Sequence, residues 1–333
     1  MHMGDALISP VVGGTMLAAA VAVSAVSIKK VKEMDEKKLP LMGVMAAFVF
    51  AAQMINFTIP GTGSSGHLGG GMLLAVILGP YAGFLSLAAI LLIQALFFAD
   101  GGYLAYGCNL INMGFYACFI AYPFIYKFFT KRKMTRTRIA LGSIIASIIG
   151  LQLGAFSVVL QTVLSGKTAV LPFNQFVWTM QGIHLAIGLV EGIVTAAVVS
   201  FVWKVRPDII NEEASDRKKS NKALVTGFLI AALALGGIVS LFASANPDGL
   251  EWSIGKVTGK ELKGDTEIHD VLEKAQEKTA VLPDYGFKSD RNSETAGTAV
   301  SGIAGSGITL GTIVLIGFVI NYFKKRRIRQ SDN

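Results

Sequence analysis

The chain has 333 residues, of which 52% are hydrophobic and only 16% are charged. Soluble proteins of this length usually carry about 25% charged residues, so this composition excludes an ordinary soluble protein. Two cysteines are too few for a disulfide scaffold. The net charge of +8 does not indicate nucleic-acid binding, because long apolar runs separate the basic clusters. The composition instead indicates a multi-span protein with membrane lipid as its solvent.

Nine apolar stretches are predicted as membrane helices, because a crossing needs roughly 20 mostly apolar residues. They are Leu7–Ile28, Leu41–Ile59, Leu68–Leu78, Tyr81–Ala99, Leu104–Phe129, Ile139–Leu164, Phe176–Trp203, Ala223–Ala243 and Gly302–Tyr322. The third is too short to cross alone as a straight helix, so we expect a half-helix joined to the fourth at Gly79-Pro80. The predicted fold class is an all-α membrane protein, a polytopic transmembrane helix bundle of about nine spans.

Basic residues predict the orientation of this bundle. Of the 30 basic residues, 22 follow the first, fifth and seventh spans or close the chain. They are Lys29, Lys30, Lys32, Lys37, Lys38, Lys127, Lys131, Arg132, Lys133, Arg136, Arg138, Lys204, Arg206, Arg217, Lys218, Lys219, Lys222, Lys324, Lys325, Arg326, Arg327 and Arg329. The positive-inside rule places them in the cytoplasm, with the N-terminus outside and the C-terminus inside.

The start of the chain does not resemble a cleaved signal peptide. Met1–Pro10 has no positively charged n-region and carries Asp5 before the first span. His2 is a large neighbour of the initiator methionine and generally blocks its removal. We therefore expect the mature chain to begin at Met1.

The pattern divides the chain into two blocks. Residues 1–205 are predicted to form a seven-span unit with short loops, and 206–222 a polar cytoplasmic linker. Residues 223–333 form a second unit, with two spans around a polar external segment, 246–300, that we expect to be a small cap. His269 lies in this segment and is expected to be solvated.

His2 is a candidate metal ligand because it follows the residue that carries the free α-amine. The amine and the His2 peptide nitrogen close a five-membered ring on one ion, and that nitrogen and imidazole Nδ1 close a six-membered ring. If the peptide nitrogen ionises, the three nitrogens lie nearly in one plane. Square-planar nitrogen sets suit Ni(II) and Cu(II), and a fourth nitrogen would complete the plane.

His67 is the candidate for the fourth nitrogen. It lies in Gly61-Thr-Gly-Ser-Ser-Gly-His-Leu-Gly-Gly-Gly, on the same expected external side as Met1. Glycines permit close backbone approach, so this loop can wrap around an ion. By composition alone, a flexible loop with an incidental histidine is equally good. Pairing with His2 favours a metal site formed by Met1, His2 and His67.

His184 and Glu191 share one face of the seventh span, because they are seven residues apart. Glu191 is deep in the apolar run, where an ionisable group is costly and usually functional. A structural hydrogen-bonded pair, with Gln161 or Gln181 as a further partner, is favoured over a relay.

Motifs near both ends of the chain carry a family resemblance. The opening Met-His-Met-Gly-Asp-Ala-Leu-Ile-Ser-Pro, Gly66-His-Leu-Gly-Gly, Asp100-Gly-Gly, Asn109 and the run from Gln181 to Gly192 resemble the NikM/CbiM family over about residues 1–205. Asn246-Pro-Asp-Gly-Leu-Glu-Trp-Ser and Leu282-Pro-Asp-Tyr-Gly-Phe resemble NikN/CbiN. The chain is thus similar to a fused NikMN.

The resemblance implies the substrate-capture (S) component of an energy-coupling factor (ECF) importer in a prokaryotic plasma membrane. It implies Ni(II), or Co(II), as the transported ion, held by the Met1 amine, the His2 amide and imidazole nitrogens and the His67 imidazole. It also implies a transmembrane T component similar to NikQ/CbiQ and ATPase components similar to NikO/CbiO. We expect Asp5, Asp100 and Asn109 to orient the imidazoles.

The chain itself has no HExxH zinc motif and no GxxxxGK[ST] phosphate loop, so we predict a transport component and no enzyme. Two other classes are alternatives. A self-sufficient secondary divalent-metal permease would use Glu191 as a proton relay. An intramembrane metalloenzyme would use His67 and His184 with an open water position, and closed four-nitrogen coordination argues against it.

Overall fold

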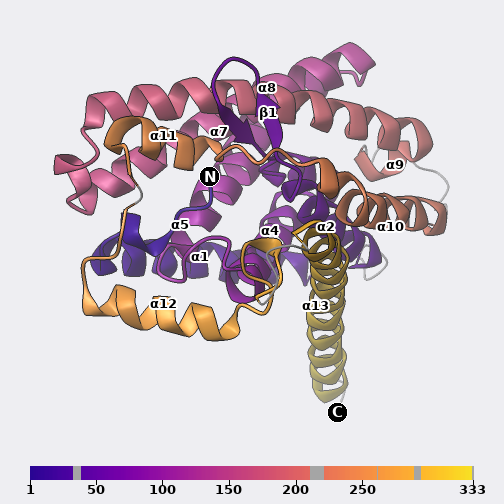
Figure 1. Cartoon of the computed structure of the whole chain (residues 1–333). Coiled ribbons are helices and arrows are strands. Elements are labelled where there is room, and N and C mark those ends of the chain that lie inside the picture. The colour runs from indigo at the N-terminus through magenta and orange to yellow at the C-terminus, as the bar shows by residue number, and fades with distance from the viewer. Residues whose placement is uncertain (33–38, 211–220, 261, 289–293, 332–333) are drawn as a thin grey trace.

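The computed structural model describes residues 1–32, 39–210, 221–260, 262–288 and 294–331, and it is mostly helical (Figure 1). Within these residues, seven helical segments are long and apolar enough to cross a membrane. They are α1 (Pro10–Val31), α4 with η3 (Pro80–Ile93 and Gln94–Phe98), α5 with η4 and α6 (Tyr106–Leu110, Ile111–Tyr126 and Lys127–Thr130), α7 (Arg136–Leu164), α8 (Phe173–Val205), α10 with η7 (Lys222–Gly237 and Val239–Phe242) and α13 (Glu294–Ser331). The polytopic helical bundle is confirmed.

The second and third expected spans are shorter than these seven. Helix α2 (Leu39–Gln53) has 15 residues, or about 22 Å, less than the roughly 30 Å of a bilayer core. The expected span Leu41–Ile59 is wrong at its end, because residues Phe57–Ile59 form strand β1 instead. Helix α3 (Gly71–Leu78) has 8 residues. Gly79, with φ 84°, then turns the chain so that α4 packs along α3, and the expected half-helix is confirmed.

The glycine-rich stretch folds into a hairpin. Strands β1 (Phe57–Ile59) and β2 (Ser64–Gly66) pair antiparallel, with Thr58 opposite Ser65. Gly61 and Gly63 near its tip have φ of 77° and 75°, a region that favours glycine. Because His67 directly follows β2, the hairpin fixes where that side chain begins.

The second block packs directly on the first. Helices α10 and α13 lie against α2. The external segment forms α11 (Gly249–Thr258), α12 (Glu267–Thr279) and η8 (Pro283–Tyr285). Helix α11 contacts α8 and β2, whereas α12 contacts η3 (Figure 1). The remaining short helices are η1 (Asp5–Leu7), η5 (Lys167–Ala169) and α9 (Pro207–Ile210).

The expectation that His269 is solvated is wrong, because its side chain is only 3% exposed. Its Nε2 donates to the Ile8 carbonyl at 2.9 Å, and its Nδ1 accepts the Asp265 N–H at 3.1 Å. The bond to Ile8 joins α12 to the segment that enters α1, and the bond to Asp265 is local to the start of α12. Residues 211–220 of the expected linker, with Lys37 and Lys38, lie outside the described residues.

Candidate metal centre

The N-terminal segment is threaded into the bundle rather than lying on its surface (Figure 1). Met1 is 5% exposed and Met3 is fully buried. The Met3 N–H donates to Asn109 Oδ1 at 2.7 Å, and Asn109 Nδ2 donates to the Met3 carbonyl at 3.1 Å. Asp5 Oδ1 accepts the Ala105 N–H at 2.9 Å. Asn109 and Asp5 thus hold the backbone of the segment, whereas we expected them to orient imidazoles.

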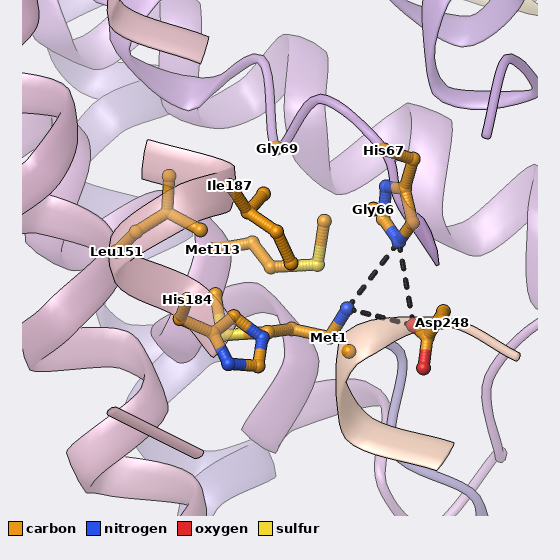
Figure 2. A pocket seen from close by; sticks show the side chains of 10 residues that line it. Met1, Gly66, His67, Gly69, Met113, Leu151, His184, Ile187 and Asp248 are labelled. Atoms are coloured by element: carbon orange, nitrogen blue, oxygen red, sulfur yellow. Dashed lines mark hydrogen bonds and ion pairs between the residues drawn. The ribbon is translucent and has the colours of Figure 1, made fainter. Parts of the chain in front are cut away.

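The three predicted ligand residues converge. The Met1 amine nitrogen lies 3.3 Å from His67 Nε2. The His2 ring stacks on the His67 ring, with centroids 4.9 Å apart and planes 22° from parallel. Figure 2 shows the Met1 amine between His67 and an acidic side chain, Asp248. Nitrogen donors that are 66 residues apart in sequence therefore meet in one place.

Hydrogen bonds assign the tautomer of His67. Its Nδ1 donates to the Leu68 carbonyl at 3.1 Å, which leaves the lone pair on Nε2. That lone pair faces the Met1 amine, the position from which a metal would be bound. Ligating histidines commonly donate their other ring nitrogen to a backbone carbonyl in this way.

A relay of amides assigns the tautomer of His2. Gln53 Nε2 donates to the Gly69 carbonyl at 2.8 Å, and Gln94 Nε2 donates to Gln53 Oε1 at 2.9 Å. Gln94 Oε1, 3.1 Å from His2 Nε2, therefore acts as acceptor, and His2 Nδ1 keeps its lone pair. Burial lowers the pKa of His2 to about 4, so the ring is neutral near pH 7. Nδ1 is the nitrogen that the chelate requires.

Asp100 lies beside His2, with its Oδ1 3.3 Å from Nδ1 of that ring, so in this tautomer a carboxylate oxygen faces the Nδ1 lone pair and no hydrogen bond joins them. Its other oxygen accepts a hydrogen bond from the Tyr285 hydroxyl, which belongs to the second block. Burial and the neighbouring carboxylate raise the pKa of Tyr285 well above its ordinary value, so the hydroxyl stays a donor. Asp100 is thus placed next to an imidazole as expected, and Tyr285 fixes its direction.

Asp248 was not predicted as part of this site. Its Oδ2 lies 3.1 Å from the Met1 nitrogen and 3.6 Å from His67 Nε2. Burial alone would raise the pKa of Asp248, but the Met1 ammonium and the His67 imidazole hold it well below its ordinary value. The second block therefore supplies a carboxylate to a group of nitrogens from the first.

The other oxygen of Asp248 caps a helix. Oδ1 accepts the N–H groups of Leu250 and Glu251, and Glu251 Oε2 accepts the Asp248 N–H at 3.3 Å. This capping box fixes the carboxylate rigidly. The spacing of Asp248 and Glu251 could have predicted the helix start, although nothing local predicts that Met1 faces it.

The hairpin orients both His67 and the loop before Asp248. The Ser65 N–H donates to the Pro247 carbonyl at 2.8 Å, and the Trp252 ring N–H donates to the Thr62 carbonyl at 3.0 Å. The segment around Asp248 is therefore bound to the strand that precedes His67.

His184 and Glu191 do not bond to each other or to Gln161 and Gln181 within the described residues. His184 Nδ1 donates to the Met180 carbonyl at 2.8 Å, and Glu191 Oε2 accepts the Gly69 N–H at 2.8 Å. The expected structural pair is therefore not formed.

Among the described residues, no group of three or more His, Cys, Asp or Glu side chains could hold a metal ion. The predicted set differs because it counts two backbone nitrogens, the Met1 amine and the His2 amide. No hydrogen bond from the His2 amide is formed within the described part of the chain.

Two known protein families together match most of the chain. Residues 2–209 match the CbiM family, the cobalt uptake substrate-specific transmembrane region, and residues 222–322 match the PDGLE domain. A protein of Archaeoglobus fulgidus named as a fused nickel transport protein, NikMN, is 32% identical over 98% of this chain and 99% of its own. The cobalt transport protein CbiM of Geobacter sulfurreducens is 29% identical over 63% of this chain and 61% of its own.

A solved structure is also similar. The crystal structure of a transition metal transporter has 35% sequence identity and a TM-score of 0.54, and it covers 62% of this chain and 93% of that chain. The similarity therefore reaches both sequence and fold.

Proposed function

The chain belongs to the CbiM family of metal uptake proteins and carries a PDGLE domain, and on this premise we propose that it captures Ni(II), or Co(II), from the outside. In this proposal it is the substrate-binding S component of an ECF importer. Its helices and its family make it a multi-pass membrane transport protein. The ion is the transported substrate and not a resident cofactor.

The meeting of the Met1 amine and His67 Nε2 at 3.3 Å, under a stacked His2 ring, carries this proposal. In the proposed complex the Met1 amine, the His2 amide, His2 Nδ1 and His67 Nε2 surround one ion. Four nitrogens suit Ni(II) and select against Mg(II) and Ca(II), which prefer oxygen.

Charge balance explains the acid beside the amine. Without metal, the Met1 ammonium pairs with the Asp248 carboxylate at 3.1 Å. When Ni(II) binds, the ammonium and the His2 amide each lose one proton. The ion and the ionised amide together then carry one positive charge, as the ammonium did before. Asp248 can therefore neutralise the site in both states.

The orientation follows from the basic clusters, which place the N-terminus and the site outside and the C-terminus in the cytoplasm. Energy for release comes from partners, a T component similar to NikQ/CbiQ and ATPases similar to NikO/CbiO. We propose the domain limits 1–205 for metal capture, 206–222 for the linker and 223–333 for the unit whose segment 246–300 covers the site.

A self-sufficient permease is the second candidate, because Glu191 is a buried acid within a spanning helix. Nickel uptake into ATP-free liposomes that contain this chain alone distinguishes the two. The S-component proposal expects no uptake above empty liposomes, and gradient-driven uptake would support the permease.

Nickel titration followed by absorption spectroscopy tests the capture site. We expect one Ni(II) per chain with the yellow, diamagnetic spectrum of a square-planar ion. A pale octahedral spectrum, with mostly oxygen and water ligands, would contradict the four-nitrogen set.

A further inference from the structure

We propose that Nε2 of His184 is a second binding position for the transported ion, one step deeper in the bundle than Met1, His2 and His67. This inference rests on the proposed function, since it concerns the path of the same ion. It assigns a role to a histidine outside the outer site, the name used below for the nitrogens of Met1, His2 and His67.

The ring of His184 is prepared to bind a cation. Its side chain is fully buried in α8, and Nδ1 donates to the Met180 carbonyl at 2.8 Å. The lone pair is therefore on Nε2, and this atom has no hydrogen-bond partner among the described residues. A buried polar atom without a partner is rare and costly, so it indicates a ligand that binds there. Neutral imidazole nitrogen suits Ni(II) and Co(II).

His184 lines the same cavity as the outer site. Met1, His67, Asp248 and His184 all border a space of about 10 Å³, roughly that of one water molecule or one ion. Figure 2 shows the His184 ring beside the Met1 side chain, across from His67. An ion that leaves the outer nitrogens can therefore reach His184 within this one cavity, past the Met1 and Ile187 side chains.

A second cavity of about 10 Å³ continues from the first, since Met1, Gly69 and Leu151 border both. This second cavity is lined by Glu191 and by Ser147, whose buried hydroxyl also lacks a partner among the described residues. Glu191 is seven residues after His184, about 10 Å further along α8 and toward the proposed cytoplasmic end. The second cavity is lined mostly by apolar side chains, with Asn112, Ser147 and Glu191 as its polar side chains.

The second block closes this cavity from outside. A Cβ at position 249 would lie 2.8 Å from Ile187 Cδ1 and 3.3 Å from His184 Cε1, so a larger residue there would have to displace the Ile187 side chain. Gly249 begins α11 directly after Asp248. The same turn that brings the carboxylate to Met1 therefore seals His184 from the external side.

Equilibrium dialysis of Ni(II) against the full chain in detergent tests this position. The double variant His2→Ala, His67→Ala disables the outer set, and we expect one weaker nickel site to remain. Adding His184→Leu should weaken that site at least about tenfold, because it removes the imidazole nitrogen that binds the ion. Adding Thr195→Val instead, at another buried polar residue of α8, should leave it unchanged.

His184→Gln gives a second variant of similar size, and it should cause the same loss because it has no ring nitrogen. Thermal unfolding of each variant checks that it is folded. No residual nickel site, or a residual site equally strong with His184→Leu and Thr195→Val, would overturn the proposal. Failure of the intact chain to bind nickel tightly would instead overturn the proposed function.

Discussion

The two blocks of the molecule contribute different chemistry to one place. The first block supplies nitrogen, from Met1, His2 and His67. The second supplies two oxygen groups. The Asp248 carboxylate contacts the Met1 amine, and the Tyr285 hydroxyl donates to Asp100, an acid of the first block that lies beside His2. In the proposed site the nitrogen donors bind the ion, whereas the Asp248 carboxylate balances its charge and the Tyr285 hydroxyl orients Asp100. Nickel affinity should therefore depend steeply on the first block and more gently on the second.

Loss of a nitrogen from the first block should have the largest effect. His2→Ala or His67→Ala should weaken Ni(II) binding at least about 1000-fold, or about 4 kcal/mol, because each removes a ligand. Calorimetry with a competing chelator measures this. Lys274→Ala, on the exposed face of α12, is the matched control and should bind normally. Near-normal binding by both histidine variants would remove the distinction between the blocks.

Proton release on nickel binding should have the next largest effect, because it depends on two nitrogens of the first block. The ammonium and the amide each lose a proton, whereas His2 is already neutral because its pKa is about 4. Where both imidazoles are already neutral and the ammonium still carries its proton, nickel affinity should therefore rise about 100-fold per pH unit as two protons are released. Calorimetry in buffers of different ionisation enthalpy counts these protons. Release of only one would show that the His2 amide does not ionise.

Asp248→Asn should have an intermediate effect. It removes the negative charge next to the amine but keeps a side-chain oxygen that can cap α11. We expect nickel binding about 10- to 100-fold weaker, the usual cost of an outer-shell partner. Glu251→Gln, which alters the other half of the capping box, should cost less than about threefold. Equal losses in both variants would mean that Asp248 acts only as a cap.

Tyr285→Phe should have the smallest effect. It removes one hydrogen bond to Asp100, worth about 1 kcal/mol, so nickel affinity should fall about fivefold. The same titration measures it. A loss as large as that of His2→Ala would show that the second block determines affinity as strongly as the first.

The sequence predicted those parts of the site whose chemistry is local. An amine next to a histidine is a chelate in any fold, and the glycines around His67 permit close approach. Asp248 could not be predicted, because it meets Met1 across 247 residues and only the packing of α11 brings them together. The Gln53–Gln94 relay is likewise tertiary.

The fold shows the same limit. Long apolar runs such as 139–164 predicted their helices within a few residues, because a lipid-facing helix depends on composition alone. The end of the expected span Leu41–Ile59 was wrong, since glycines beyond it form a hairpin that draws Phe57–Ile59 into a strand. His269 was wrong because its burial depends on docking against Ile8.

In the proposed site the amine of Met1 is a ligand, and one residue added before it separates the amine from the other nitrogens. A chain with a single glycine before Met1 keeps every side chain but moves the amine away from His67. Its nickel affinity, compared with that of the chain beginning at Met1, should fall at least about 1000-fold, with loss of the square-planar spectrum. Unchanged affinity and spectrum in the extended chain would contradict the account.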